Sequence, residues 1–285
     1  MAASDSILVR PHTSLELPLK PPVYDSNWST AQKALYGHDL QEMWDRSIAP
    51  HIWNQYHNQL GLYQELVESH PGSLPKRILD VGCAQATLAI LLAERGHLVT
   101  AVDLRSEFID YAKSRYTHGQ IEFLSGNALR LELPHRYDVV FANQIIEHLV
   151  YPEILVRGLA NLLGPGGLLV VTTPSWHYFK NQLPKFSDIG DRKAHEHRQF
   201  TSDADGHFFA YTADELAKVF RDAQLENLKV VPFETPLISG HFRVRHLHGI
   251  VPAPSLKRID SLLLRVPGIR YLLGHQLMVV GYKGN

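Results

Sequence analysis

The stretch that decides the fold is KRILDVGCAQATLAILLAERGHLVTAVD, residues 76–103. Two short apolar runs, each of strand length, flank an apolar stretch of helical length in it. Gly82 precedes the helical stretch, Gly96 follows it, and the second apolar run ends at Asp103. Because neighbouring parallel strands need a long crossover, which a helix usually supplies, this pattern predicts a parallel βαβ unit.

The same alternation continues along the rest of the chain. Further apolar runs predict strands at 121–124, 137–142, 168–173, 228–232 and 277–282, and helical patterns occupy 108–116, 154–163 and 212–223. Gly164 to Gly167 form a predicted turn before one of these strands, and Thr212 with Glu215 forms a capping box. The sequence therefore predicts a Rossmann-like, doubly wound α/β fold with a mostly parallel seven-stranded sheet.

Outside the alternation, the chain divides into additions to this core. Residues 1–70 form a predicted N-terminal arm and helical cap, because prolines interrupt 1–27 and a helical pattern covers 29–69 with a break at Pro50. Residues 71–285 form the predicted Rossmann-like domain. The domain carries two predicted insertions, at 174–211 and 233–275, where the strand–helix alternation is lost.

Bulk composition narrows the classes of function. The formal net charge of −1 argues against a dedicated nucleic-acid binder, which usually carries a basic face. Cys83 is the single cysteine, which excludes an intrachain disulfide and fits a reducing compartment. The sequence shows no secretory signal and no apolar run of membrane-spanning length. We therefore expect a cytoplasmic protein.

Polar and small residues follow the predicted strands where a ligand would bind. In open parallel sheets, ligands lie beyond the carboxyl ends of the strands. Gly82 allows close approach of the backbone, Asp103 can accept both hydroxyls of a ribose, and Asn127 with Ala128 is placed to contact an adenine edge. The G-x-G-x-x-G fingerprint of dinucleotide-binding dehydrogenases fails, because Ala84 and Thr87 occupy the second and third glycine positions.

The motif set resembles the class I S-adenosylmethionine-dependent methyltransferases. The resemblance rests on LDVGCA at 79–84, GH at 96–97, VD at 102–103, YDVV at 137–140, EHL at 147–149 and LLGPGG at 162–167. It implies S-adenosyl-L-methionine as cofactor and a cofactor site that contains Asp80, Gly82, Cys83, Ala84, Asp103, Leu104, Asn127, Ala128 and Asn143. Two positions depart from the family pattern. Ala86 replaces a usual glycine and is expected to crowd the cofactor slightly, and Asn127 stands where an acid is more frequent.

The segment after the fourth strand carries the predicted chemistry. If it forms a helical turn, Gln144, Glu147 and His148 share one face, and His207 before the 212–223 helix reaches the same rim. Q-x-x-E-H resembles the E-x-x-E-H of two groups of metal-using O-methyltransferases, those of small-RNA 3′ ends and of ubiquinone biosynthesis. We therefore predict Glu147, His148 and His207 as catalytic residues and as ligands of a divalent metal. Without a metal, one of the two histidines would act as general base. His195 to His197 are a second, less specific cluster.

The predicted function is O-methylation of a small-molecule acceptor. RNA 2′-O-methylation and a non-catalytic, S-adenosylmethionine-binding regulatory role are the alternatives. The aromatic side chains of the cap are expected to pack the cap on the sheet rather than to roof a substrate, and 174–211 is expected to act as a substrate lid. An amphipathic stretch at 256–266 is interpreted as a lid or homodimer helix rather than a membrane contact.

Overall fold

The computed structural model describes residues 22–199 and 207–284. Within these residues, seven strands form one sheet in the order β3-β2-β1-β4-β5-β7-β6. Strands β1 to β5 pair in parallel, and β7 runs antiparallel to both of its neighbours. The strands are Arg77–Val81 (β1), Leu98–Asp103 (β2), Gln120–Ser125 (β3), Tyr137–Asn143 (β4), Leu163–Pro174 (β5), Leu225–Phe233 (β6) and Gln276–Lys283 (β7). The predicted fold class is confirmed.

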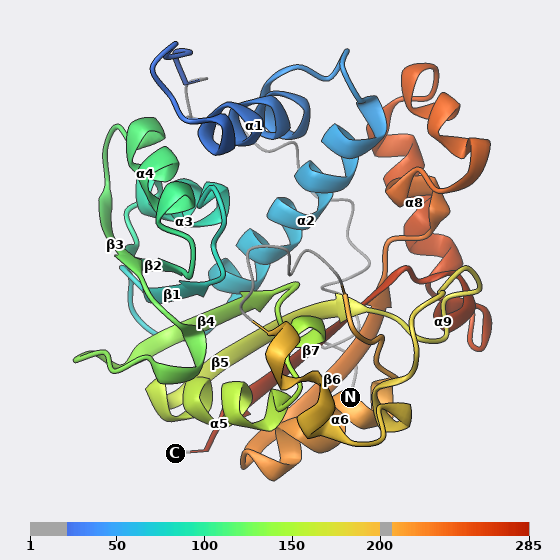
Figure 1. Ribbon diagram of the computed structural model, residues 1–285. Helices are drawn as coiled ribbons and strands as arrows, with labels where there is room; N and C mark the ends of the chain where they lie inside the picture. Colours follow the sequence, from blue (N-terminus) through green and yellow to red (C-terminus); the bar gives the residue numbers. More distant parts are fainter. Residues whose placement is uncertain (1–21, 200–206, 285) are drawn as a thin grey trace.

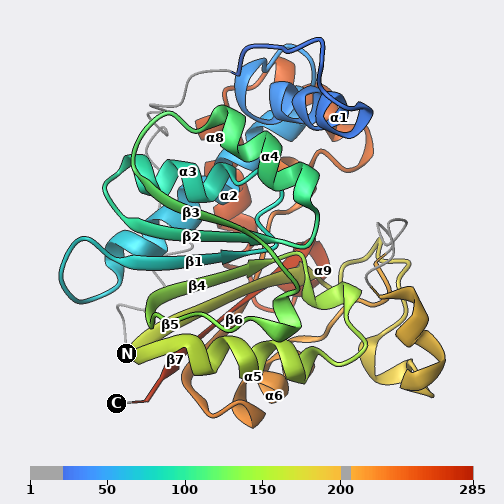
Figure 2. The same ribbon diagram turned by 60° about the vertical axis from the view of Figure 1, so that its left-hand side comes forward.

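Helices cover both faces of the sheet (Figures 1 and 2). One face carries α3 (Thr87–Glu94) and α4 (Ser106–Arg115), and the other carries α5 (Pro152–Leu162) and α6 (Ala213–Asp222). Each face has its own apolar core: residues such as Ile78 of β1 pack against α3, and residues such as Leu79 pack toward α5 and α6. The alternation of apolar side chains to both faces explains why β1 reads as a continuous apolar run.

The Gly164–Gly167 stretch differs from its prediction as a separate turn. It lies within β5, where Tyr137 pairs with Leu163 and Val139 already pairs with Leu168. The extra residues are therefore accommodated as a bulge in the strand. Gly167 is needed there, because a Cβ atom would lie 2.9 Å from the carbonyl oxygen of Gly164 and 3.0 Å from that of Tyr137.

The cap is helical as predicted and is tied to the domain by a buried ion pair. It consists of α1 (Thr30–Asp39), the π-helix η2 (Leu40–Trp44) and α2 (Pro50–Ser69), which begins at the predicted break. Arg115 Nη2 of α4 lies 3.2 Å from Asp39 Oδ1, and both side chains are buried. Tyr111 also donates a hydrogen bond to Asp39, so α1 is held on α4 by charge as well as packing. The first 21 residues of the predicted arm lie outside the described residues.

The two insertions extend the carboxyl-end side of the sheet. The first contains only short 3-10 turns among its described residues, η5 (Phe186–Asp188) and η6 (Arg192–Arg198). The second contains α7 (Pro236–Ser239), η7 (Phe242–Gly249), α8 (Ala253–Leu263) and α9 (Ile269–Leu273). In Figures 1 and 2, α8 lies next to α2, so the second insertion joins the cap into one helical layer. No helix among the described residues is long and apolar enough to cross a membrane.

Candidate active site

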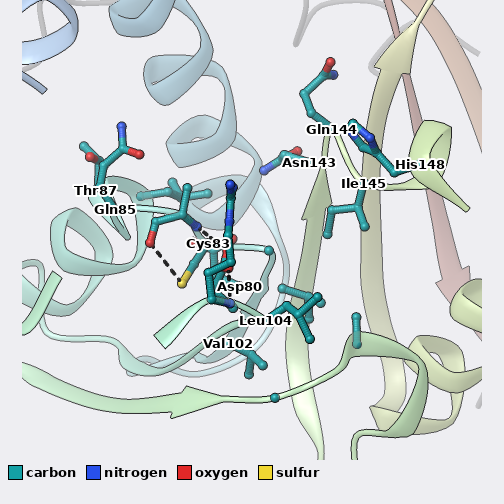
Figure 3. Close-up of a pocket in the computed structure, with 18 of the residues that line it drawn as sticks. Asp80, Cys83, Gln85, Thr87, Val102, Leu104, Asn143, Gln144, Ile145 and His148 are labelled. Atoms are coloured by element: carbon teal, nitrogen blue, oxygen red, sulfur yellow. Dashed lines mark hydrogen bonds between the residues drawn. The ribbon is translucent and has the colours of Figure 1, made fainter. Parts of the chain in front are cut away.

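A cavity of about 600 Å³ opens beyond the carboxyl ends of β1, β2 and β4 (Figure 3). Its volume is that of a site for a small molecule or cofactor. All of the residues predicted to contact the cofactor line it, namely Asp80, Gly82, Cys83, Ala84, Asp103, Leu104, Asn127, Ala128 and Asn143. The topology explains their meeting: β4 crosses to the other side of β1, which makes this edge the switch point of the sheet.

Gly82 lets the loop after β1 pass close to the segment after β4. Its φ is +67°, and a Cβ atom at this position would lie 2.5 Å from Ile145 Cδ1. The Gly82 amide donates to the carbonyl of Val102 over 2.8 Å, which fixes the loop against β2. No other residue type fits this conformation and this space without strain.

Asp103 is held rigidly at the end of β2. The Ala84 amide donates to its Oδ2 over 2.9 Å, and the Arg105 amide donates to its Oδ1 over 3.0 Å. Each carboxylate oxygen keeps a second lone pair for a ligand in the cavity. Asp80 lies nearby, and burial, with the charge of Asp103, raises the pKa of Asp80 to about 7. Two carboxyl groups, those of Asp80 and Asp103, thus line the cavity side by side.

Ala86 does not crowd the cavity, contrary to the prediction. Its side chain is fully buried in the core around α3, while its neighbours Gln85 and Thr87 line the cavity. Ala86 has φ +56° and ψ +30°, the left-handed conformation that glycine adopts without cost. The usual glycine at this position is therefore explained by backbone conformation rather than by space for a ligand.

The cap contributes a wall of the cavity, a role that the sequence analysis ranked below packing. Tyr56, Gln59, Leu60 and Tyr63 of α2 all line it. Their spacing of three, four and seven positions places them on one helical face, and this was the signal available in the sequence. The preference for packing was only partly correct, because Tyr63 both lines the cavity and packs on Phe141, with ring centroids 5.6 Å apart.

A second group of side chains, Glu147, His148 and His207, meets beside the cavity. One potential ligand atom of each lies within 4.8 Å of the other two. The imidazole centroids of His148 and His207 are 5.0 Å apart, and His207 Nε2 lies 3.7 Å from Glu147 Oε1. The predicted convergence of these three residues is therefore present, while their catalytic and metal-binding roles stay predictions.

Two hydrogen bonds to backbone carbonyls of η4 bring His207 to this group from 60 positions away in the chain. Glu147 and His148 lie in the 3-10 turn η4 (Ile146–His148), directly after β4. The Phe208 amide donates to the Glu147 carbonyl over 3.0 Å, and the Tyr211 hydroxyl donates to the Ile146 carbonyl over 2.9 Å. The stretch before α6 is thus fastened along η4, and this contact positions the neighbouring His207.

Burial controls the protonation of this group. The Glu147 side chain is fully buried, and Thr173 donates to its Oε2 over 3.1 Å. Burial raises the pKa of Glu147 to about 8, and burial lowers the pKa of His207. Both shifts disfavour the charged forms and would be reversed for Glu147 by a nearby cation. Two imidazole nitrogens and one carboxylate oxygen are a donor set that fits a divalent metal ion.

Gln144 lies differently from its prediction. Its φ of +53° places it outside the η4 turn, so helical spacing is not what brings it near Glu147. The end of its side chain lies between Glu147 and Gln276, 3.2 Å from Glu147 Oε1 on one side and 3.1 Å from Gln276 Oε1 on the other. With its nitrogen toward Glu147, the amide donates to the carboxylate, so Gln144 is a hydrogen-bond partner of Glu147 rather than an oxygen ligand.

The other predicted features of the first insertion are less informative. His195 to His197 lie in η6, where Glu196 accepts a hydrogen bond from Tyr151. That cluster is not one of the metal-like groups among the described residues. The lid role of 174–211 stays a prediction, and residues 200–206 of that segment lie outside the described residues.

Comparison with known proteins gives one family. The chain matches the family model for a methyltransferase domain over residues 39–230. It is 26% identical over 152 residues to the ubiquinone biosynthesis O-methyltransferase of Stutzerimonas stutzeri, covering 52% of this chain and 64% of that protein. The corresponding protein of Nitrosospira multiformis is 29% identical over 182 residues, covering 58% of this chain and 69% of that protein.

The solved structures agree on the fold. Phosphoethanolamine N-methyltransferase 2 of Haemonchus contortus, in complex with S-adenosyl-L-methionine, has a TM-score of 0.55 and 14% identity, covering 92% of this chain and 62% of that chain. The matched part spans just under two thirds of the Stutzerimonas relative.

Proposed function

We propose that this chain transfers a methyl group from S-adenosylmethionine to a hydroxyl oxygen of a small molecule. The proposal starts from its family: the chain belongs to the class I S-adenosylmethionine-dependent methyltransferases. The cofactor supplies an activated methyl group on a sulfonium, so the protein mainly has to align the acceptor and remove its proton. The named activity of the Stutzerimonas and Nitrosospira relatives, O-methylation in ubiquinone biosynthesis, supports an oxygen acceptor.

One observation carries this proposal: His148 belongs to both groups of side chains. It lines the cofactor cavity together with Asn143 and Gln144, and its ring packs edge-on against that of His207. A hydroxyl held beside His148 would therefore face both the cofactor and the Glu147–His207 pair. Such alignment removes much of the entropic barrier of a bimolecular displacement.

The residues of the chain can be given separate tasks. Asp103 would accept the ribose hydroxyls, because its two oxygens are already oriented by backbone amides. His148 or His207 would take the acceptor proton, and the lowered pKa of His207 keeps that imidazole neutral, as a base requires. Glu147, held by Thr173, would face the imidazolium that forms at His207, whose positive charge would favour the ionised carboxylate. The Gln144 amide would keep the Glu147 carboxylate in place.

A divalent ion is a second way for the same group to work. Glu147, His148 and His207 would hold it, and a bound cation would lower the pKa of the acceptor hydroxyl. In that case the buried carboxylate gains the positive partner that favours its ionised form. The small negative net charge of the chain argues for a small molecule rather than RNA as acceptor.

The test is methyl transfer from labelled S-adenosylmethionine to a panel of phenols and catechols, with a short RNA as a further acceptor. We expect calorimetric binding of the cofactor and transfer to at least one phenolic hydroxyl. Exhaustive chelation followed by addition of Mg²⁺ or Zn²⁺ separates the two mechanisms. Full activity after chelation rejects the metal form, and labelled RNA with unlabelled phenols rejects the small-molecule acceptor. Cofactor binding without transfer to any acceptor supports a regulatory role instead.

A further inference from the structure

The second insertion carries a stripe of exposed apolar side chains, which we term the α8–α9 surface. Its members recur every three or four positions from α8 through the following turn into α9, and their exposed fractions range from 40% to 54%. They are Ile259, Leu262, Val266, Ile269 and Leu272. The opposite side of α8 is accounted for, because Leu256 and Asp260 are buried against the protein. Five exposed apolar side chains within 14 residues of one helix–turn–helix segment point to an interaction surface.

The same segment is strongly basic. Residues 253–273 contain four basic residues, Lys257, Arg258, Arg265 and Arg270, and one acidic residue, Asp260. Asp260 is buried, so its carboxyl group adds no negative charge to the surface. Arg258 and Arg265 are exposed among the apolar side chains. The segment therefore has a formal net charge of +3, whereas the chain as a whole has −1. Whatever binds this surface must tolerate both apolar contact and positive charge.

The α8–α9 surface continues toward the candidate active site. The Phe179 amide donates to the Leu272 carbonyl over 3.0 Å, and the rings of His177 and Tyr271 lie 6.2 Å apart. Trp176 and Phe179, with exposed fractions of 38% and 42%, thus extend the apolar side chains onto the segment that follows β5. Figure 1 shows α9 beside this segment. Thr173, the hydrogen-bond donor to Glu147, lies only three residues before Trp176.

We propose that the α8–α9 surface docks on a lipid bilayer that contains anionic lipids. Apolar side chains flanked by arginines are the composition of interfacial helices, which insert apolar groups between head groups while the cations contact lipid phosphates. This proposal replaces the interpretation of 256–266 as a lid or homodimer helix. A second copy of this chain fits less well, because a symmetric contact would bring the same positive charges together. This inference does not depend on which reaction the protein catalyses.

The experiment is co-sedimentation of the full chain with vesicles of phosphatidylcholine alone or with phosphatidylglycerol added. We expect binding to the anionic vesicles that weakens as salt is raised, and little binding to the neutral ones. The double substitution I259E/L262E should weaken binding at least about tenfold, because it removes both inserted side chains and adds negative charge. R258E/R265E should weaken it at least about 25-fold, because each arginine lost costs about fivefold.

The matched control is Ile154→Glu on α5, which places the same change at an apolar side chain that is 49% exposed on another part of the protein. Its binding to vesicles should equal that of the unmodified chain. Melting curves and cofactor binding of all variants report whether the fold is intact. Absence of vesicle binding, binding that does not depend on anionic lipid, or equal losses in I154E and I259E/L262E would overturn the proposal. The proposal would also be overturned if the chain did not bind vesicles but formed concentration-dependent dimers that I259E/L262E abolishes.

Discussion

Two carboxylates, Asp103 and Glu147, lie on the two sides of the candidate site and are built in different ways. Asp103 accepts hydrogen bonds from the amides of Ala84 and Arg105, which belong to the same βαβ unit and its flank. Glu147 is fully buried, is held by Thr173, and faces His207 from a remote part of the chain. The contacts that hold Asp103, on the proposed cofactor side, are therefore made by local sequence, whereas the proposed acceptor side around Glu147 is assembled from three separate segments.

The difference has a physical consequence for each side. Backbone amides hold Asp103 in one orientation whatever the surrounding side chains are. The Glu147 side of the site depends on side chains, and burial raises the pKa of Glu147. We expect substitutions on the acceptor side to change turnover and those on the cofactor side to change cofactor affinity.

The largest expected effect is that of His207→Ala. Loss of a base or metal ligand at this position should lower kcat by about 10²–10⁴-fold. The dissociation constant of S-adenosylmethionine should stay unchanged, because His207 is not among the residues that line the cavity. Single-turnover kinetics and calorimetry give the two quantities. The comparison of the two sides breaks down if cofactor affinity falls as much as turnover does.

A suitable control is His177→Ala. His177 is an exposed histidine of the same insertion, so its substitution repeats the chemical change away from the Glu147 group. It should keep nearly full turnover. A loss of turnover as large as that of His207→Ala would indicate that the insertion as a whole, and not the position of one imidazole, matters.

A smaller effect is expected from Asp103→Asn on the cofactor side. Loss of the charged acceptor should raise the dissociation constant of S-adenosylmethionine by about 10- to 100-fold, since hydrogen bonds to charged groups contribute about 1.5–3 kcal/mol. At saturating cofactor, kcat should change little. Asp110→Asn, at an exposed position of α4, is the control and should bind as the unmodified chain does. Unchanged affinity in Asp103→Asn would remove the ribose assignment.

The same division explains how far the sequence could predict the molecule. Strands β1 and β2, the loop after β1 and Asp103 follow from runs and glycines that lie within 28 residues of one another, and the residues predicted to contact the cofactor do line one cavity. The wall formed by α2 was the less favoured of two predictions, because a helical face reads alike whether it covers a core or a ligand. The orientation of Gln144 was wrong, because its positive φ depends on the path of the chain from β4 into η4.

The bulge in β5 was not predicted for a related reason. The Gly164–Gly167 stretch reads as a turn, and only its pairing with β4 makes it a bulge within β5.

The approach of His207 to Glu147 was predicted from the topology of the sheet, which places loops that follow neighbouring strands at one edge. Its distance could not be predicted, since it depends on the hydrogen bond between Phe208 and Glu147.

The smallest expected effect is that of Ala86→Gly, which tests whether the cofactor side is as local as it looks. Glycine relieves a left-handed conformation that costs an alanine about 1–2 kcal/mol. It also removes a buried methyl group worth about 0.8 kcal/mol and adds about 0.5–1 kcal/mol of chain entropy to the unfolded state. The free energy of unfolding should therefore change by less than about 1 kcal/mol in chemical denaturation. Because the Ala86 methyl points into the core and away from the cavity, cofactor affinity should stay within about twofold, a difference of about 0.4 kcal/mol. Tighter binding by fivefold or more (about 1 kcal/mol) would show that the methyl group does crowd the cofactor, and that the loop between β1 and α3 moves when the cofactor binds.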